Sequence, residues 1–166
     1  MTLAIAPLAL EEIDALLALA REVWRAHYPA IIGEAQTEYM LAQRYSPNIV
    51  RAEIARGDVW WDRLSDDGEI VAFASSFAGD EPGAVKLDKL YVHPQRQRMG
   101  YGAALMEHTC ERAQRLGMRK VLLAVNKRNV HAIAAYRKSG FEIAAAVVKD
   151  IGGGFVMDDY IMEKTL

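Results

Sequence analysis

Residues 87–105 read LDKLYVHPQRQRMGYGAAL and carry, in order, the signals of a strand, a loop and a helix. Leu87 and Leu90 are both apolar, yet they lie an odd number of residues apart along the strand. This break in the period of two predicts a β-bulge near Asp88-Lys89. Pro94 cannot continue a strand ladder, so the strand is expected to end there.

Gly100 and Gly102 fall in the first turn of the helix that is predicted from Gly100 to Leu116. Glycine lets a ligand approach the backbone closely, and the free N–H groups of a first helical turn attract a phosphate. Arg96 and Arg98 add positive charge beside this turn. A phosphate site is one interpretation, and a tight strand-to-helix turn without a ligand is the other.

Two common phosphate motifs do not match these glycines. A Walker A loop places Lys and then Ser or Thr after its glycines, whereas Gly102 precedes Ala103-Ala104. The dinucleotide fingerprint G-x-G-x-x-G needs a third glycine where this chain has Leu105. Neither motif therefore accounts for the two glycines.

The flanking sequence predicts one α+β domain with a mixed sheet. Ser46-Pro47 is typical of a helix N-cap followed by the first helical residue, and Gly57 is typical of a helix end. The sequence has no linker, low-complexity tract or internal repeat, so residues 1–166 are expected to form a single domain. Strands are predicted over 2–5, 59–64, 69–78, 85–93, 120–126, 141–151 and 155–164, and helices over 10–27, 34–44, 47–57, 100–116 and 130–138.

The composition excludes several classes of protein. Hydrophobic residues make up 52% and charged residues 25%, which is typical of a folded globular chain rather than a disordered one. A formal charge of −2 gives no net positive field, so a nucleic-acid partner is not expected. The apolar-rich region 6–20 is interrupted by three carboxylates, so no membrane span is expected. With one cysteine and no signal-peptide pattern, a cytoplasmic location is the expectation.

Two separated motifs resemble the GCN5-related N-acetyltransferase (GNAT) family. Gln97-Arg-Met-Gly-Tyr-Gly resembles the family's R/Q-x-x-G-x-G/A acyl-CoA motif, and Leu90-Tyr-Val-His-Pro resembles its fourth strand. Downstream, Asn129, Ala134-Ala-Tyr136 and Gly140-Phe141 match a second family element in the right order. The order of the predicted elements is also similar to the family fold along nearly the whole chain.

Within the family, the ending of the chain is most similar to the PaiA-type spermidine/spermine N-acetyltransferase group. This narrower resemblance covers residues 150–164, DIGGGFVMDDYIMEK, together with Tyr39-Met-Leu and Tyr45-Ser-Pro near the start. Members of one subfamily can differ in substrate, so the acceptor does not follow from it.

The resemblance implies a fold, a co-substrate and a reaction. The implied fold is a mixed, mostly antiparallel sheet flanked by helices, with a splay between the fourth and fifth strands. The implied reaction moves the acetyl group of acetyl-CoA directly to a primary amine of a small molecule, a polyamine being one candidate, without a metal. Two alternatives are a non-catalytic acetyl-CoA-binding regulator and a protein or peptide N-acetyltransferase. A homodimer is a further expectation drawn from the family.

The same resemblance assigns the acetyl-CoA contacts. Backbone groups in the fourth strand would bind the pantetheine arm, and backbone N–H groups of the following loop would wrap the pyrophosphate. Asn129 and Tyr136 would lie beside the cofactor at the end of the fifth strand and on the helix after it. The strand residues are Leu90, Tyr91 and Val92, and the loop residues are Gln97, Arg98, Met99, Gly100, Tyr101, Gly102 and Ala103.

Tyr136 and Asp88 are the catalytic candidates. Tyr136 matches the family tyrosine near the cofactor sulfur that serves as general acid in several members, and simple packing under the sheet is the alternative. Many relatives carry a glutamate in the fourth strand, where this chain has Asp88. Asp88 is therefore the candidate base. The alternative is that Asp88 is a solvated residue at the bulge and that ordered water carries the proton instead.

Aromatic residues are the candidates for the acceptor side. Trp24, Tyr28 and Tyr160 could hold an alkylammonium group by cation–π attraction, and Asp158 and Asp159 could add opposite charge. Core packing or a solvated edge is the alternative for each residue taken alone.

Other reactive residues are given structural interpretations. The four histidines are scattered without a metal-binding spacing, so no metal site is expected; they are His27, His93, His108 and His131. Cys110 falls on a helix face with apolar neighbours and is expected to be a small buried residue. Gly152 to Gly154 precede a strand, which favours a hairpin turn over a phosphate loop.

Overall fold

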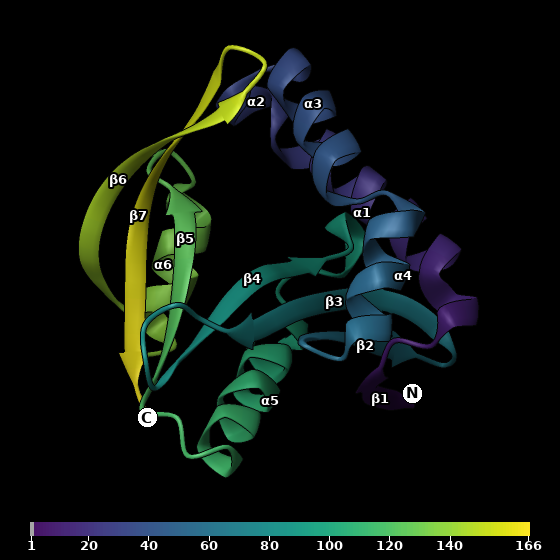
Figure 1. Ribbon diagram of the computed structural model, residues 1–166. Coiled ribbons are helices and arrows are strands. Elements are labelled where there is room, and N and C mark those ends of the chain that lie inside the picture. The colour runs from purple at the N-terminus through teal and green to yellow at the C-terminus, as the bar shows by residue number, and fades with distance from the viewer. Residues whose placement is uncertain (1) are drawn as a thin grey trace.

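The sheet of the computed structural model, which describes residues 2–166, has seven strands in the order β1-β2-β3-β4-β5-β7-β6 (Figure 1). The helices lie on both faces of this sheet. The strands are β1 (Leu3–Pro7), β2 (Val59–Asp66), β3 (Glu69–Ala78), β4 (Ala84–Val92), β5 (Lys120–Asn126), β6 (Glu142–Gly152) and β7 (Phe155–Thr165). The helices are η1 (Leu10–Glu12), α1 (Ile13–His27), α2 (Pro29–Ile32), α3 (Glu34–Arg44), α4 (Pro47–Arg56), η2 (Pro94–Arg96), α5 (Tyr101–Arg115) and α6 (Val130–Lys138).

The predicted splay between the fourth and fifth strands is confirmed. β4 and β5 are parallel and pair only from Ala84 with Lys120 to Lys86 with Leu122. Beyond that point β4 continues to Val92 beside β3, whereas β5 continues to Asn126 beside β7. Figure 1 shows the two halves of the sheet diverging from this junction, so the predicted mixed sheet is confirmed as well.

The predicted β-bulge lies at Asp88. On β3, Ser75 is opposite Lys89 and the next residue, Ser76, is opposite Leu87, so Asp88 has no partner in the ladder. The extra residue reverses the faces that the following side chains occupy. Without it, Lys89 would share a face with Leu87.

Two hydrophobic clusters fill the two faces of the sheet. One lies under α5 and α6 and includes Leu105, Phe141 and Met162, none of which is more than 1% exposed. The other lies under α1, α3 and α4 and includes Trp24 and Phe73, also at most 1% exposed. Burying each of these large side chains stabilises the fold by about 1.5–3 kcal/mol.

Local signals end the helices where the sequence predicts. The Ser46 hydroxyl accepts a hydrogen bond from the N–H of Ile49, which caps α4, and Gly57 follows α4 with a φ of +72°. The single turn of α2 was not predicted, because four residues are too few to show a helical period. It begins at Pro29 and ends before Gly33, whose φ is +83°.

The β6–β7 hairpin, with its turn at the predicted glycines, docks on α3. The Tyr39 hydroxyl donates to the carbonyl of Ile151 at 2.9 Å, and the Gln36 amide donates to the carbonyl of Val156 at 2.7 Å. A Cβ atom at Gly153 would lie 2.8 Å from the Tyr39 ring, so only glycine lets the turn approach this closely. The hairpin tip therefore reaches the helices across the open end of the splay, as Figure 1 shows.

None of the helices within residues 2–166 is long and apolar enough to cross a membrane.

Candidate active site

The loop between β4 and α5 is anchored at the end of β2. Arg96 forms an ion pair with Asp66 at 2.9 Å, and the Tyr101 hydroxyl donates to the same carboxylate at 3.1 Å. The Asp66 carboxylate therefore offsets the positive charge that Arg96 was expected to add beside the phosphate site. The Tyr101 side chain is buried, which leaves only the backbone of this residue to face a ligand.

The first turn of α5 presents its backbone without obstruction. Gly100 precedes the helix with a φ of +82°, and a Cβ atom there would meet nothing within 4 Å. A Cβ atom at Gly102 would contact only the Val92 side chain, at 3.6 Å. Because first-turn N–H groups have no acceptor within their helix, this open backbone fits an anionic group such as a pyrophosphate. The other loop residues of the predicted set, Gln97, Arg98, Met99 and Ala103, are exposed beside it.

One edge of β4 is open along the splay. Leu90, Tyr91 and Val92 pair with β3 on one side, whereas the ladder with β5 ends at Lys86. Backbone groups on the β5 side of this segment are therefore available to an extended ligand. This arrangement fits the hydrogen bonds that the sequence predicted for a pantetheine arm.

Asn129 and α6, the helix that carries Tyr136, follow β5 on the opposite side of the splay. Asn129 lies between β5 and α6, is buried, and its side-chain oxygen is 3.1 Å from His27 Nε2. Tyr28 follows α1, and its hydroxyl is 2.9 Å from the Tyr91 hydroxyl. Burial raises the pKa of Tyr136, with a smaller contribution from Tyr28, so Tyr136 stays protonated at neutral pH.

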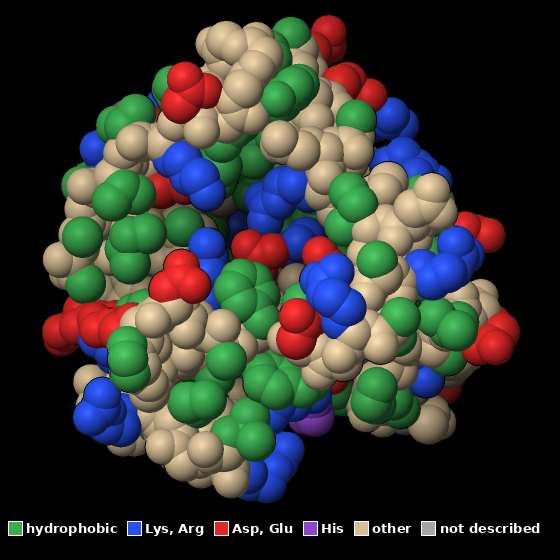
Figure 2. All heavy atoms as spheres, viewed as in Figure 1, with side chains coloured by type: hydrophobic (Ala, Val, Ile, Leu, Met, Phe, Trp, Pro, Cys, Tyr) green, Lys and Arg blue, Asp and Glu red, His purple; other side chains and the backbone are tan. Residues whose placement is uncertain are grey.

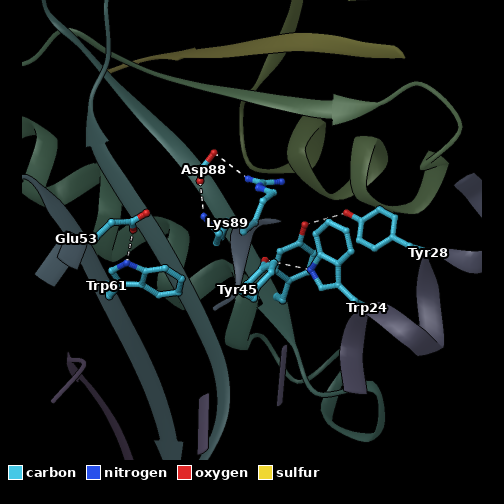
Figure 3. Close-up of polar contacts among 9 residues, drawn as sticks. Trp24, Tyr28, Tyr45, Glu53, Trp61, Asp88 and Lys89 are labelled. Carbon is cyan, nitrogen blue, oxygen red and sulfur yellow. Dashed lines mark hydrogen bonds and ion pairs between the residues drawn. The ribbon is translucent and has the colours of Figure 1, made fainter. Parts of the chain in front are cut away.

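A cluster of charges surrounds the bulge in β4 (Figure 3). Asp88 is 3.1 Å from Arg44 and 2.6 Å from the Lys89 ammonium group. Lys89 is 5% exposed and lies over the rings of Tyr45 at 5.5 Å and Trp61 at 5.1 Å. Burial lowers the pKa of Lys89, although the Asp88 charge opposes the effect.

The environment of Asp88 does not support its predicted role as the base. Burial by itself would raise the pKa of this carboxyl, but the charges of Arg44 and Lys89 outweigh burial and lower it to about 2. A carboxylate with so low a pKa is a poor proton acceptor at neutral pH. It is not a solvated bulge residue either, because it is bound between two cations.

Sequence reasoning did not identify Arg44 or Lys89 as parts of this cluster. A lysine in a strand usually extends into solvent, so its type gives no signal. The predicted bulge was the available signal, because one extra residue at Asp88 turns Lys89 towards the aromatic side chains under α1, α3 and α4.

The structure separates the three predicted acceptor residues. Trp24 is 1% exposed and donates to the Tyr45 hydroxyl at 3.1 Å, so it is a core residue rather than a contact for a ligand. Tyr160 packs against the cluster under α6, on the other face of the sheet. Tyr28 is half-buried beside Tyr91 and is the one of the three that borders the splay.

A hollow lies between the β5–β7–β6 arm and the helices α1 and α3, at the centre of the face in Figure 2. Basic and acidic side chains gather within it.

The two adjacent carboxylates of β7 differ sharply in their surroundings. Asp158 is exposed and forms an ion pair with Lys127 at 2.8 Å, whereas Asp159 is 4% exposed.

The surroundings of the remaining reactive residues favour a structural role. No group of three or more His, Cys, Asp or Glu side chains within residues 2–166 is placed to hold a metal ion. Cys110 is buried in the cluster under α5 and α6, and burial raises the pKa of its thiol. A raised pKa reduces the thiolate fraction and so disfavours a nucleophilic role.

Comparison with known proteins gives a family and several relatives. The sequence model of the acetyltransferase (GNAT) family matches residues 15–141. An uncharacterised N-acetyltransferase of Mycobacterium tuberculosis is 36% identical over 100 residues, which are 60% of this chain and 63% of that protein. The match thus spans less than two thirds of that relative's length.

Further comparisons give two relatives with named acceptors and one solved structure. The spermidine N(1)-acetyltransferase of Thermoplasma acidophilum is 26% identical over 168 residues, covering 99% of this chain and 98% of that protein. The structure of the PaiA N-acetyltransferase of the same organism in complex with coenzyme A covers 100% of both chains with a TM-score of 0.86 and 25% identity. The alanine N-acetyltransferase of ribosomal protein bS18 from Escherichia coli is 35% identical over 83 residues, 49% of this chain and 54% of that protein.

The Asp88 cluster predicts an acid-dependent loss of stability. The folded-state pKa of about 2 lies below the ordinary value of 3.8, so the stabilisation is present above about pH 4 and disappears as the pH falls towards 2. At about 1.4 kcal/mol per pKa unit, the difference in unfolding free energy between wild type and Asp88→Asn should shrink by roughly 2 kcal/mol over this range. Urea unfolding of both proteins at a series of pH values measures this difference in unfolding free energy.

Asp58→Asn is the control for this prediction, because Asp58 forms an exposed ion pair with Arg56 at 3.2 Å. The difference in unfolding free energy between Asp58→Asn and wild type should stay constant over the same pH range. Parallel pH profiles for Asp88→Asn and wild type would contradict the assigned environment of Asp88.

Proposed function

The chain belongs to the acetyltransferase (GNAT) family, and from this premise we propose that it transfers the acetyl group of acetyl-CoA directly to a primary amine of a small molecule. One observation carries the proposal. β4 and β5 separate after three paired residues and leave an open strand edge between the first turn of α5 and Tyr136. A thioester ligand could lie in this gap with its phosphates at one end and its sulfur near the tyrosine.

Each end of the gap would bind a different part of acetyl-CoA, which supplies an activated acetyl group when bound. The N–H groups around Gly100 and Gly102 would hold the pyrophosphate, and the free edge of Leu90 to Val92 would bind the pantetheine arm. Asn129 would contact the ligand from the β5 side. The coenzyme A complex of the Thermoplasma relative supports this assignment, since that structure superposes over the whole chain.

The chemistry would then fall to groups with fixed positions and protonation states. Tyr136 keeps its proton at neutral pH, so it could donate that proton to the departing thiolate. A backbone N–H beside the bulge at Asp88 would stabilise the charge that develops on the carbonyl oxygen. The charge cluster of Arg44, Asp88 and Lys89 would hold the bulge in place.

A small cationic amine is the acceptor that we propose, with a polyamine such as spermidine as the leading candidate. The hairpin tip docks on α3 through Tyr39 and Gln36, so an acceptor must enter the hollow beneath these contacts. A flexible alkylamine can do so without displacing the hairpin. The full-length similarity to a spermidine acetyltransferase supports the same class.

A protein N-terminus is the second candidate, because the ribosomal-protein relative has the higher identity. That similarity covers 49% of this chain, however, whereas the similarity to the spermidine enzyme covers 99%. A folded protein would also need the hairpin to move away from α3. A non-catalytic acetyl-CoA-binding protein would have no need for a protonated tyrosine at the end of the gap.

An acceptor screen tests the proposal. Release of the coenzyme A thiol would be measured with acetyl-CoA and spermidine, spermine, simple alkylamines, glutamate and an alanine-initiated peptide. We expect kcat/KM for a polyamine to exceed that for glutamate at least about tenfold, a difference of about 1.4 kcal/mol. Preference for the acidic amino acid would contradict the proposed charge of the acceptor. Turnover on the peptide alone would favour the second candidate, and no turnover with tight acetyl-CoA binding would favour the regulator.

Substitutions at Gly102 test the acetyl-CoA site. Gly102→Ala has room in the free protein, since its Cβ would meet only Val92 at 3.6 Å. Gly102→Glu adds bulk and negative charge where the pyrophosphate would bind, so acetyl-CoA affinity should fall about tenfold or more by calorimetry. Unfolding free energy should stay equal or rise in both variants, because Ala and Glu favour a helix more than Gly does. Wild-type affinity in a folded Gly102→Glu protein would exclude this site.

Tyr136→Phe tests the proton donor, because it removes the hydroxyl and keeps the ring that packs against Phe141. With a good acceptor, kcat should fall about 10²–10⁴-fold while acetyl-CoA affinity changes little. Rapid-quench measurements would confirm that chemistry limits the rate. A folded variant with wild-type kcat under those conditions would leave Tyr136 only a packing role.

A further inference from the structure

Asp159 is a largely buried residue whose carboxylate has no partner within residues 2–166, and its oxygens are not fully enclosed. It is 4% exposed, and in the part of the chain that the structure describes no hydrogen-bond donor or cation contacts its oxygens. Burying an unpaired carboxylate destabilises a fold, so such groups are rare outside sites that bind a ligand or carry out chemistry. The other buried carboxylates are each paired with an arginine: Asp62 with Arg112 at 2.7 Å, and Asp66, through one of its two oxygens, with Arg96 at 2.9 Å.

The position of Asp159 in β7 directs its side chain towards the hollow. Alternate residues of a strand point to opposite faces, and Tyr160 packs on the α6 side whereas Met157 packs on the side of α1 and α3. Asp159 shares the face of Met157. It is also paired in register with Asn126, the last residue of β5, which places it beside the open end of the splay.

The charges that act on Asp159 come from the elements around the hollow. Arg44 at the end of α3, Lys86 on β4 and Lys127 after β5 favour its ionised form, and Asp158 disfavours it. Its charge also acts on Tyr28, which in turn acts on Tyr136. Tyr28 is therefore within electrostatic range of both Asp159 and the proposed proton donor.

The neighbouring titratable groups are poorly suited to accept a proton. The pKa of Asp88 is lowered to about 2 by Arg44 and Lys89, which outweigh its burial. Burial raises the pKa of Tyr28 and of Tyr91, so both phenols are protonated at neutral pH. For Asp159, burial outweighs the surrounding cations, and the net effect raises its pKa above the ordinary value. A raised pKa brings a carboxylate closer to the range in which a general base works well.

We propose that Asp159 is the catalytic base, which receives the acceptor amine as its ammonium ion and removes a proton from it. This inference rests on the proposed function and adds to it the residue that the sequence left open. Asp159 faces the hollow on the α1 and α3 side of the sheet, whereas Tyr136 packs against the cluster under α5 and α6. The two groups would thus act on opposite sides of the reacting carbon.

The proton and electron balance of the transfer is complete with these two residues. Asp159 takes one proton from the ammonium ion, which frees the lone pair that forms the bond from nitrogen to the acetyl carbon. The bond from that carbon to sulfur breaks, and the thiolate takes the Tyr136 proton. The second proton lost by nitrogen restores Tyr136 through solvent, and Asp159 releases its proton to water.

Asp159→Asn tests the inference, with Asp58→Asn, in the exposed ion pair described above, as the matched control. In Asp159→Asn, kcat/KM with the best amine should fall about 10²–10⁴-fold at pH 7. It should recover as the pH approaches the pKa of the amine, because the free amine then needs no base. Asp58→Asn removes the same charge from an exposed ion pair and should change kcat/KM less than about twofold. Folding of Asp159→Asn should be preserved, since an amide is less costly to bury than a carboxylate.

A second measurement does not depend on turnover. Carbon-13 NMR of the aspartate carboxyl groups in the protein without ligands should contain one resonance that titrates above the ordinary range and is missing in Asp159→Asn. Addition of spermidine should shift the same resonance. A titration at or below the ordinary aspartate pKa would overturn the inference.

The possible results separate the two proposals. If the wild type acetylates amines and Asp159→Asn retains its kcat and pH profile while KM rises, Asp159 anchors the amine and the base assignment is wrong. If Asp159→Asn matches Asp58→Asn in every respect, Asp159 has no role in the site. If the wild type acetylates no amine, the proposed function fails, and the carboxyl titration then shows separately whether Asp159 has the environment of a base.

Discussion

The short parallel pairing of β4 with β5 is the constraint on which the rest of the site depends. Three residues of β4 pair with β5, and this junction is secured by the N–H of Arg119 bound to the carbonyl of Gly83 at 2.7 Å. Lys120 adds ion pairs to Glu81 at 3.0 Å and Glu163 at 3.3 Å. Past the junction the bulge at Asp88 bends β4 away, so one sheet acquires an open internal edge without losing its two hydrophobic clusters. A strand edge inside a fold is otherwise paired or covered, which is why this one is suited to a ligand.

The charged residues around the bulge and the hollow divide into a paired set and an unpaired carboxylate. Arg44, Asp88 and Lys89 satisfy one another at the bulge, and Lys89 also lies against two aromatic rings. Breaking such a buried set leaves an uncompensated charge, so each member holds the others in place. Asp159 has no such partner within residues 2–166, although it is buried as well. One aspartate is thus neutralised by two cations, and the other keeps its carboxylate without a partner.

The β6–β7 hairpin connects the two halves that the splay separates. Its strands extend the β5 half of the sheet, and its tip returns to α3, where Tyr39 binds the carbonyl of Ile151. Gly153 permits this approach, because any side chain there would collide with the Tyr39 ring. The hairpin also carries Asp159 on the face that looks across the hollow, so the element that docks on α3 also contributes an unpaired carboxylate.

Local order in this protein follows from the sequence alone. The bounds of α3, α4 and α6, the β-bulge and the turn at Gly152 to Gly154 depend on caps, glycine conformations and side-chain periods within a few residues, and all of these are readable from the chain. The glycine loop before α5 and the tyrosine of α6 were likewise visible as motifs.

The surroundings of individual side chains were decided only by the tertiary structure. Asp88 is inert because Arg44, more than forty residues earlier, lies against it, and Trp24 and Tyr160 are removed from the acceptor side by packing on opposite faces of the sheet. Charge and burial at each of these positions depend on long-range strand pairing, about which no local pattern carries information.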